Sequence, residues 1–233
     1  MNDLTEISEF LSTNNFRAFN SSLAKFRSHF PLLAEEKTEL DRILKTWLDT
    51  NLQGDAAHIV NTVSLLCQCG FSFNNDADKL FLIEAVATFL NNQSHTATST
   101  AKFFILLHEM NYTWSLMDNE FQNKVKTLVD ELLLDDDQLT GAKSNRLVAA
   151  IVKLEMKWEH LSLQARHHIL TTSISLCRDA NEKASFLASL ARLGPSQEEL
   201  NDRQIRKRIL FLVYDSLKTS NDSVKLVSRF ISL

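Results

Sequence analysis

Glycine and proline are scarce in this chain, with four glycines and two prolines among 233 residues. No two glycines are closer than sixteen residues, so backbone amides cannot gather into a glycine-rich phosphate loop. The same scarcity excludes the dinucleotide-binding fingerprint and the G-x-S-x-G nucleophile turn. It also leaves little material for tight β-turns. Together with a hydrophobic fraction of 44%, it favours an all-α fold.

Cysteine is scarce as well. The three cysteines, Cys67, Cys69 and Cys177, are an odd number, so a disulfide framework is not expected. One residue separates Cys67 from Cys69, which is not the C-x-x-C spacing of a zinc site, and no second pair follows. We therefore expect reduced thiols within the protein core.

Motifs for metal ligation and catalysis are missing. His108 and Glu109 begin like the H-E-x-x-H motif of zinc proteases, but Tyr112 occupies the position of the second histidine. The aspartates at 135–137 lack the glycine and the distal glutamate of a calcium loop. We expect no metal, no cofactor and no enzymatic activity. An enzyme of unrecognised type stays open as an alternative, because catalytic triads are set by geometry rather than by spacing.

Long hydrophobic runs are absent too. Wholly apolar runs such as 103–107 are a fraction of the roughly 20 residues that span a bilayer. The opening sequence MNDLTEISEF is acidic and mixed, unlike the basic flank and apolar stretch of a secretory signal. The sequence therefore predicts no membrane span and a cytoplasmic location, or delivery into a host cytosol if the protein is an effector.

What the chain does have is a repeated motif, in which three apolar residues at i, i+3 and i+6 are followed directly by one further residue. Copies recur every 39 to 44 residues, which is the period of stacked helical hairpins. An aromatic residue follows three positions later in three copies, at Phe73, Trp114 and Trp158, and Gln197 takes that place in the fourth. We expect these aromatics to plug the ends of the hairpins. The four copies are Val63, Leu66, Cys69 and Gly70; Phe104, Leu107, Met110 and Asn111; Val148, Ile151, Leu154 and Glu155; and Leu187, Leu190, Leu193 and Gly194.

A second amphipathic helix is predicted after each copy, beginning at a polar capping residue. The capping candidates are Asn75, Asp118, Ser162 and either Asn201 or Asp202. Each second helix carries its own apolar stripe, and a lone hairpin cannot cover both stripes. The predicted stripes are Leu80, Ile83 and Val86; Phe121, Val125, Leu128 and Leu132; Ala165, Ile169 and Ser173; and Ile205, Ile209, Leu212 and Val213.

These patterns predict an all-α fold, a right-handed α-solenoid of about five helical hairpins and about 12 helices. The fifth hairpin is a degenerate early copy at Leu23, Phe26 and Phe30, with a second helix over 33–48. We expect one domain over 1–233, with a cap helix at 1–13, repeats over 14–220 and a C-terminal helix at 221–233. The C-terminal helix is expected to dock on the preceding hairpin, and the alternative is a recognition peptide.

The motif with its following tryptophan and second helix resembles the helical-hairpin repeats of octotricopeptide and FAST-type proteins. It is also similar to helical-repeat effectors of intracellular bacteria. The resemblance covers roughly residues 20–215. Organellar relatives of the first kind bind RNA through a basic inner surface and often open each unit with a proline-rich pair, and this chain has neither feature. Effectors of the second kind imply a host protein as the target.

The charge balance argues against a protein whose main task is to hold a phosphate backbone, since the net charge is −4 and the pI is about 6.0. We therefore expect a non-enzymatic adaptor that binds another protein or a peptide segment. The candidate contact residues, expected to be exposed, are Tyr112, His160, Arg166 and His167. Nucleic-acid binding is the alternative and predicts a continuous cationic stripe built from Lys143, Arg146, Lys153, Lys157, Arg203, Arg206, Lys207 and Arg208.

Overall fold

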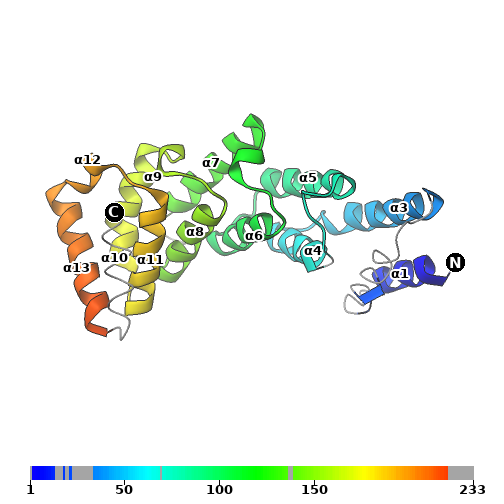
Figure 1. Cartoon of the computed structure of the whole chain (residues 1–233), viewed down its shortest axis with the longest axis horizontal. Coiled ribbons are helices and arrows are strands. Elements are labelled where there is room, and N and C mark those ends of the chain that lie inside the picture. Colours follow the sequence, from blue (N-terminus) through cyan, green and yellow to red (C-terminus); the bar gives the residue numbers. More distant parts are fainter. Residues whose placement is uncertain are drawn as a thin grey trace. The chain divides into compact units, whose positions relative to one another are not determined.

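The chain is helical throughout the part that its computed structural model describes, which is residues 2–13, 18, 21, 22, 34–68, 70–135 and 139–219 (Figure 1). No strand occurs among these residues, so the all-α prediction is confirmed. None of the helices described is long and apolar enough to cross a membrane. The predicted helix at 221–233 and the early copy at Leu23, Phe26 and Phe30 lie outside the described residues.

The helices differ widely in length. Their bounds are α1 (Asn2–Ser12), α3 (Ala34–Asn51), α4 (Ala56–Gln68), α5 (Asp76–Asn91), α6 (Ala97–Glu109), α7 (Asn119–Leu134), α8 (Gly141–Lys153), α9 (Leu163–His168), α10 (Ile174–Leu176), α11 (Ala180–Leu193), α12 (Gln197–Leu200) and α13 (Arg203–Thr219). Two 3₁₀ turns, η1 (Trp114–Leu116) and η2 (Trp158–His160), precede α7 and α9. A π-helical segment, η3 (Ile169–Ser173), connects α9 to α10 without a break.

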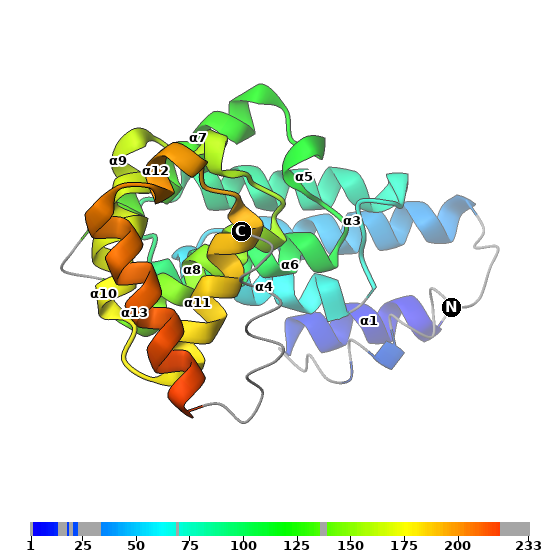
Figure 2. The ribbon, with the colours of Figure 1, turned by 60° about the vertical axis from the view of Figure 1, so that its left-hand side comes forward.

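The chain divides into two compact units. The N-terminal unit comprises Met1–His95 with Glu109–Tyr112, and the C-terminal unit comprises Thr96–His108 with Thr113–Leu233. In the N-terminal unit α3 packs against α1, α4 and α5. In the C-terminal unit α11 lies between α8 and α13, and η3 and α10 contact the same two helices (Figure 2). The expected organisation, a single domain over 1–233, stays a prediction.

The last residue of each repeat motif adopts the left-handed backbone conformation that ends a helix. The φ angles are 79° at Gly70, 62° at Asn111, 66° at Glu155 and 78° at Gly194, and these are the positive φ angles of the described chain. In two copies the next amide closes the helix end, since Phe71 N donates to Leu66 O at 3.1 Å and Met156 N donates to Ile151 O at 3.2 Å. This is the Schellman arrangement of a helix C-terminus. The motif therefore ends in a left-handed residue at four places.

The predicted plug aromatics Phe73, Trp114 and Trp158 are buried, with exposed fractions of 6%, 6% and 4%. Their expected burial is confirmed, and their role as plugs of hairpin ends stays a prediction. Two of them also bond backbone to backbone with the motif of the next copy. Phe73 N donates to Met110 O at 2.9 Å, and Trp114 N donates to Leu154 O at 2.8 Å. An equivalent hydrogen bond thus joins the turn after one motif to the third apolar residue of the following motif, once in each compact unit.

The second helices begin at the expected capping residues, because a side-chain oxygen there accepts from an amide of the first turn. Asn75 accepts from Ala77 N at 3.1 Å, and Asp118 accepts from Phe121 N at 2.8 Å. The other two caps are equivalent. Ser162 accepts from Ala165 N at 3.1 Å, while Asp202, rather than Asn201, accepts from Gln204 N at 2.9 Å and Ile205 N at 3.0 Å.

The predicted apolar stripes are buried in three of the four second helices, apart from a half-buried Val213. The stripe predicted for α5 is wrong, because Leu80 and Ile83 are 67% and 43% exposed. Helix α5 is apolar over most of its circumference, so a three-residue spacing did not single out the buried side. The apolar residues that it buries are Phe81, Leu82, Ala85, Val86 and Phe89, and Asp78 in its first turn is buried with them.

Candidate functional site

Tyr112 was expected to be an exposed contact residue, and this expectation is wrong. Its side chain is 6% exposed. The ring stacks on Phe73, with ring centroids 3.9 Å apart and the ring planes 13° from parallel. Because Tyr112 directly follows the left-handed Asn111, the turn carries its ring into the protein interior. Tyr112 therefore packs in the interior beside Phe73.

His160 is engaged in a similar way in the C-terminal unit. Its ring stacks on Trp114 at a centroid distance of 4.7 Å, and Lys126 Nζ lies 5.6 Å from the centroid of that same indole ring. His160 Nδ1 accepts a hydrogen bond from Lys157 N at 3.0 Å. Burial lowers the pKa of His160, and the positive charges of Lys126 and Lys157 act in the same direction, against the raising effect of Glu159. His160 is thus a neutral stacking partner at neutral pH.

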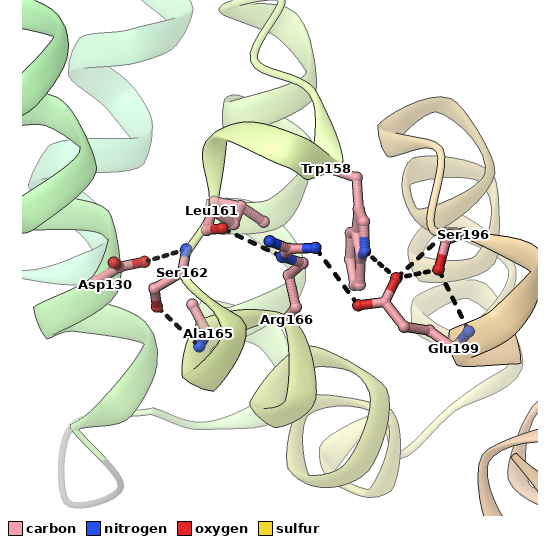
Figure 3. Close-up of polar contacts among 8 residues, drawn as sticks. All are labelled: Asp130, Trp158, Leu161, Ser162, Ala165, Arg166, Ser196 and Glu199. Carbon is pink, nitrogen blue, oxygen red and sulfur yellow. Dashed lines mark hydrogen bonds and ion pairs between the residues drawn. The ribbon is translucent and has the colours of Figure 1, made fainter.

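Arg166 belongs to a polar cluster centred on Glu199 (Figure 3). Glu199 Oε2 accepts from Trp158 Nε1 at 2.6 Å, from Ser196 Oγ at 2.6 Å and from Ser196 N at 3.2 Å. Glu199 Oε1 lies 3.6 Å from Arg166 Nη1. Arg166 Nε in turn donates to Leu161 O at 3.1 Å. We call Trp158, Arg166, Ser196 and Glu199 the Glu199 cluster.

The Glu199 cluster stabilises an ionised carboxylate. Partial burial by itself raises the pKa of Glu199, but hydrogen bonds from Ser196 and Trp158 and the charge of Arg166 outweigh it, so the pKa lies below its ordinary value of 4.5. A carboxylate that accepts from this many donors and has a lowered pKa is a weak proton acceptor. The cluster therefore connects η2, α9 and α12 structurally.

Sequence reasoning missed Glu199, although one signal was present. Ser196 and Glu199 have the S-x-x-E spacing of a capping box, and both of its hydrogen bonds form. The bond from Trp158 could not have been found in this way, because the two residues are 41 positions apart. The contact does follow the repeat, because Glu199 and His160 each lie five positions after a left-handed turn residue. Each contacts the tryptophan of the preceding copy, Glu199 meeting Trp158 and His160 meeting Trp114.

The predicted cationic residues of α13 separate into two groups. Arg208 Nη1 donates to Thr171 O at 2.6 Å and to Ser175 Oγ at 3.3 Å. Thr171 lies in the π-helical segment η3, and its carbonyl also accepts from Ser175 Oγ at 2.8 Å. Arg208 is thereby used within the fold. Arg203, Arg206 and Lys207 are exposed.

The cationic residues around α8 are mostly exposed. Arg146 and Lys153 are seven positions apart and lie on one exposed face of the helix. Lys157 is exposed beyond the helix end, and Lys143 is half-buried. Seven of the eight predicted cations are thus exposed and Lys143 is half-buried, and the continuous stripe on which the nucleic-acid alternative depends stays a prediction.

His167 is exposed and lines a pocket of about 470 Å³ between α9 and α13 in the C-terminal unit. The pocket also holds Glu199, Asp202 and Arg208. Each of these three already binds another group, since Glu199 accepts from Trp158, Asp202 caps α13 and Arg208 binds Thr171 O. The pocket thus places one exposed imidazole next to charged groups that the fold already uses.

No group of three or more His, Cys, Asp or Glu side chains that could hold a metal ion occurs within the described ranges. Cys67 and Cys177 carry free thiols. Burial raises the pKa of Cys177 to about 11, so this thiol stays protonated at neutral pH and is a poor nucleophile. Comparisons of the chain with models of protein families, with curated proteins and with solved structures find no match.

Proposed function

We propose that this protein is a non-enzymatic helical-repeat module that binds another protein or a peptide segment. The observation that carries the proposal is the recurrence of one turn geometry at Gly70, Asn111, Glu155 and Gly194. In this proposal the chain is a right-handed α-solenoid of about five hairpins, in which each hairpin buries its apolar faces against the neighbouring hairpins.

Two further observations support a binding role over a catalytic one. Two titratable side chains near the turns, His160 and Glu199, are used within the fold. The outward faces of the helices instead carry scattered exposed groups, which is how helical arrays recognise other chains. The free thiols Cys67 and Cys177 support a reducing compartment such as the cytosol. A resemblance to octotricopeptide, FAST-type or effector repeats is part of the proposal.

The binding function is tested by affinity capture from a eukaryotic cell lysate, using the tagged full chain with and without nuclease and identifying both protein and RNA. We expect a protein that is recovered equally after nuclease treatment. Recovery dominated by RNA and abolished by nuclease would replace the proposal with the nucleic-acid alternative. Arg146→Glu/Lys153→Glu serves as the matched variant, because it removes the exposed cations of α8 that RNA binding would use.

The arrangement of the hairpins is tested separately by small-angle X-ray scattering. A compact globular chain of this length has a radius of gyration of about 17 to 18 Å. An extended array of five hairpins is expected to exceed that value clearly. A radius of gyration at the globular value for the monomer would contradict the solenoid.

A further inference from the structure

Helix α13 presents an exposed stripe that is divided into a cationic and an apolar half. Residues spaced three and four apart lie along one side of a helix, and the stripe follows this spacing. Its N-terminal half carries the three cations and its C-terminal half carries side chains that are 54%, 61% and 57% exposed. We call this surface the α13 stripe; it consists of Arg203, Arg206, Lys207, Leu210, Phe211 and Tyr214.

The opposite side of α13 is occupied by the fold. Ile205, Ile209 and Leu212 are buried, and α13 packs there against α11, α10 and η3. The α13 stripe is therefore separate from the side of the helix that packs into the core. Large apolar side chains side by side on a surface mark an interaction site more often than single ones do.

A groove of about 710 Å³ runs beside the α13 stripe, between α13 and the segment around α10. Phe211, Tyr214 and Lys207 belong to both the stripe and the groove, and Ile174 and Cys177 contribute further apolar surface. The apolar half of the stripe is thus next to a depression that can take a large side chain.

The charges available at this surface are positive. Lys183 also lines the groove, but its ammonium group pairs with Asp215 at 2.7 Å, and Arg208 is bound to Thr171 O. By contrast, no ion pair joins Arg203, Arg206 or Lys207 to an acidic side chain in the described part of the chain. Three available cations on a chain of net charge −4 form a local site for negative charge.

From this juxtaposition we infer that the α13 stripe and its groove bind an acidic peptide segment that carries large apolar side chains. The inference rests on the proposed protein-binding function and names the partner's chemistry. Aliphatic or aromatic side chains of the peptide pack on Leu210, Phe211 and Tyr214 and enter the groove. Its carboxylates pair with Arg203, Arg206 and Lys207, so that charge fixes the register and apolar burial supplies affinity.

Two observations favour a peptide over a lipid surface or a nucleic acid. The cationic and apolar halves follow one another along the helix axis, whereas a membrane-bound helix exposes an apolar face along its length with basic residues beside it. The groove requires a projecting side chain, which a flat bilayer does not offer. Nucleic acid would need cations alongside the aromatics for backbone contact, whereas Arg203, Arg206 and Lys207 all precede Leu210, Phe211 and Tyr214 along the helix.

The test uses the full chain and three synthetic peptides of about sixteen residues, each with Leu and Phe at helical spacing. The remaining positions carry Glu in the first peptide, Gln in the second and Lys in the third. Binding is measured by fluorescence anisotropy at about 50 and about 200 mM salt. We expect the Glu peptide to bind at least about tenfold more tightly than the Gln peptide at low salt and to lose that advantage at high salt.

Variants then locate the site. Arg206→Glu/Lys207→Glu is expected to weaken binding of the Glu peptide by about tenfold or more, and Phe211→Ala is expected to weaken the Glu and Gln peptides alike. The matched control, Arg146→Glu/Lys153→Glu, changes the net charge equally on α8 and should leave peptide binding unaltered. Far-UV circular dichroism checks that every variant is folded.

Several results would overturn the inference. They are failure of the Glu peptide to bind, equal affinity for the Glu and Gln peptides at low salt, and insensitivity to the α13 variants. Binding to vesicles of phosphatidylcholine with phosphatidylserine, or to a uridine oligonucleotide, that exceeds peptide binding and depends on the α13 stripe would assign the surface to that ligand instead. Lysate capture of a protein that the α13 variants do not weaken would reject this site and leave the protein-binding function standing.

Discussion

The strongest quantitative prediction concerns Trp158, whose indole is buried and donates to the Glu199 carboxylate at 2.6 Å. Trp158→Ala removes a side chain that is 4% exposed, and truncations of this kind cost about 3 to 5 kcal/mol of unfolding free energy. Trp158→Phe keeps most of the ring but removes the N–H donor. Loss of a hydrogen bond to a charged group costs about 1.5 to 3 kcal/mol. We expect the lower end, because Ser196 and Arg166 still contact Glu199.

The two contributions are separated by urea denaturation followed by far-UV circular dichroism, which avoids changes in tryptophan fluorescence. Glu199→Gln is combined with Trp158→Phe in a double-mutant cycle, and a coupling of about 0.5 to 3 kcal/mol is expected for residues in direct contact. The control is Leu163→Ala in the same unit, because Leu163 is 68% exposed and such a change should stay within about 0.5 kcal/mol.

Clear results would refute this reasoning. A loss below about 1 kcal/mol for Trp158→Ala would mean that the indole does not fill the hairpin end. Additive effects of Trp158→Phe and Glu199→Gln would mean that the indole N–H and the carboxylate do not stabilise each other. Either result would also remove the reason for regarding the aromatic of each turn as a plug.

Further predictions concern the same cluster and the helix ends. Because the pKa of Glu199 is lowered in the folded state, its contribution to stability is present above its ordinary pKa of 4.5 and is lost as pH falls. The difference in thermal midpoint between wild type and Glu199→Gln should therefore shrink in acid. A difference that stays constant with pH would contradict the lowered pKa. Glu155→Gly should raise stability by about 1 kcal/mol, because a side chain at φ 66° is strained, and an unchanged or lower midpoint would count against the left-handed turn. Gly194→Ala should cost about 1 kcal/mol through the same strain, since its added Cβ would meet no other atom. Gly141→Ala should cost more stability than Gly194→Ala, about 1 to 3 kcal/mol, because the added Cβ would overlap the Leu176 carbonyl. Chemical denaturation compares the unfolding free energies of the two variants. The reverse order would be evidence against the close approach of Gly141 to Leu176.

The features that the sequence predicted well are those fixed by local chemistry. The apolar spacing of the motif stops where each first helix ends, so these four helix ends could be located from the sequence, although the left-handed conformation of Asn111 and Glu155 was not predicted. The caps Asn75, Asp118 and Ser162 were equally accessible, because a short polar side chain before an amphipathic segment satisfies the first amides. The buried residues of α3, among them Trp47, also follow their helical period.

The features that could not be predicted depend on what a side chain meets after folding. Tyrosine is a residue type that often contacts partners, and only the stacking on Phe73 shows that Tyr112 lies in the protein interior. Arg208 belongs to a basic run in the sequence, yet a π-helical segment 37 residues away uses it. Leu80 fits an apolar stripe but points outward, because its helix offers more than one apolar side. Each of these outcomes is decided by a neighbour that is distant in sequence.

The left-handed turns also bear on how a chain of this kind changes over evolutionary time. Glycine, asparagine and glutamate all occupy the same turn conformation here. In three copies a buried phenylalanine or tryptophan lies three positions later. What the four copies share is a backbone angle, which other residues than glycine can adopt at a cost of about 1 kcal/mol, whereas the buried aromatic is shared by three copies and replaced by the exposed Gln197 in the fourth. Copies can therefore exchange nearly all their letters while the hairpin persists. Similarity between such sequences can then fall to a low level although the turn conformation, and the helix end that it forms, is kept.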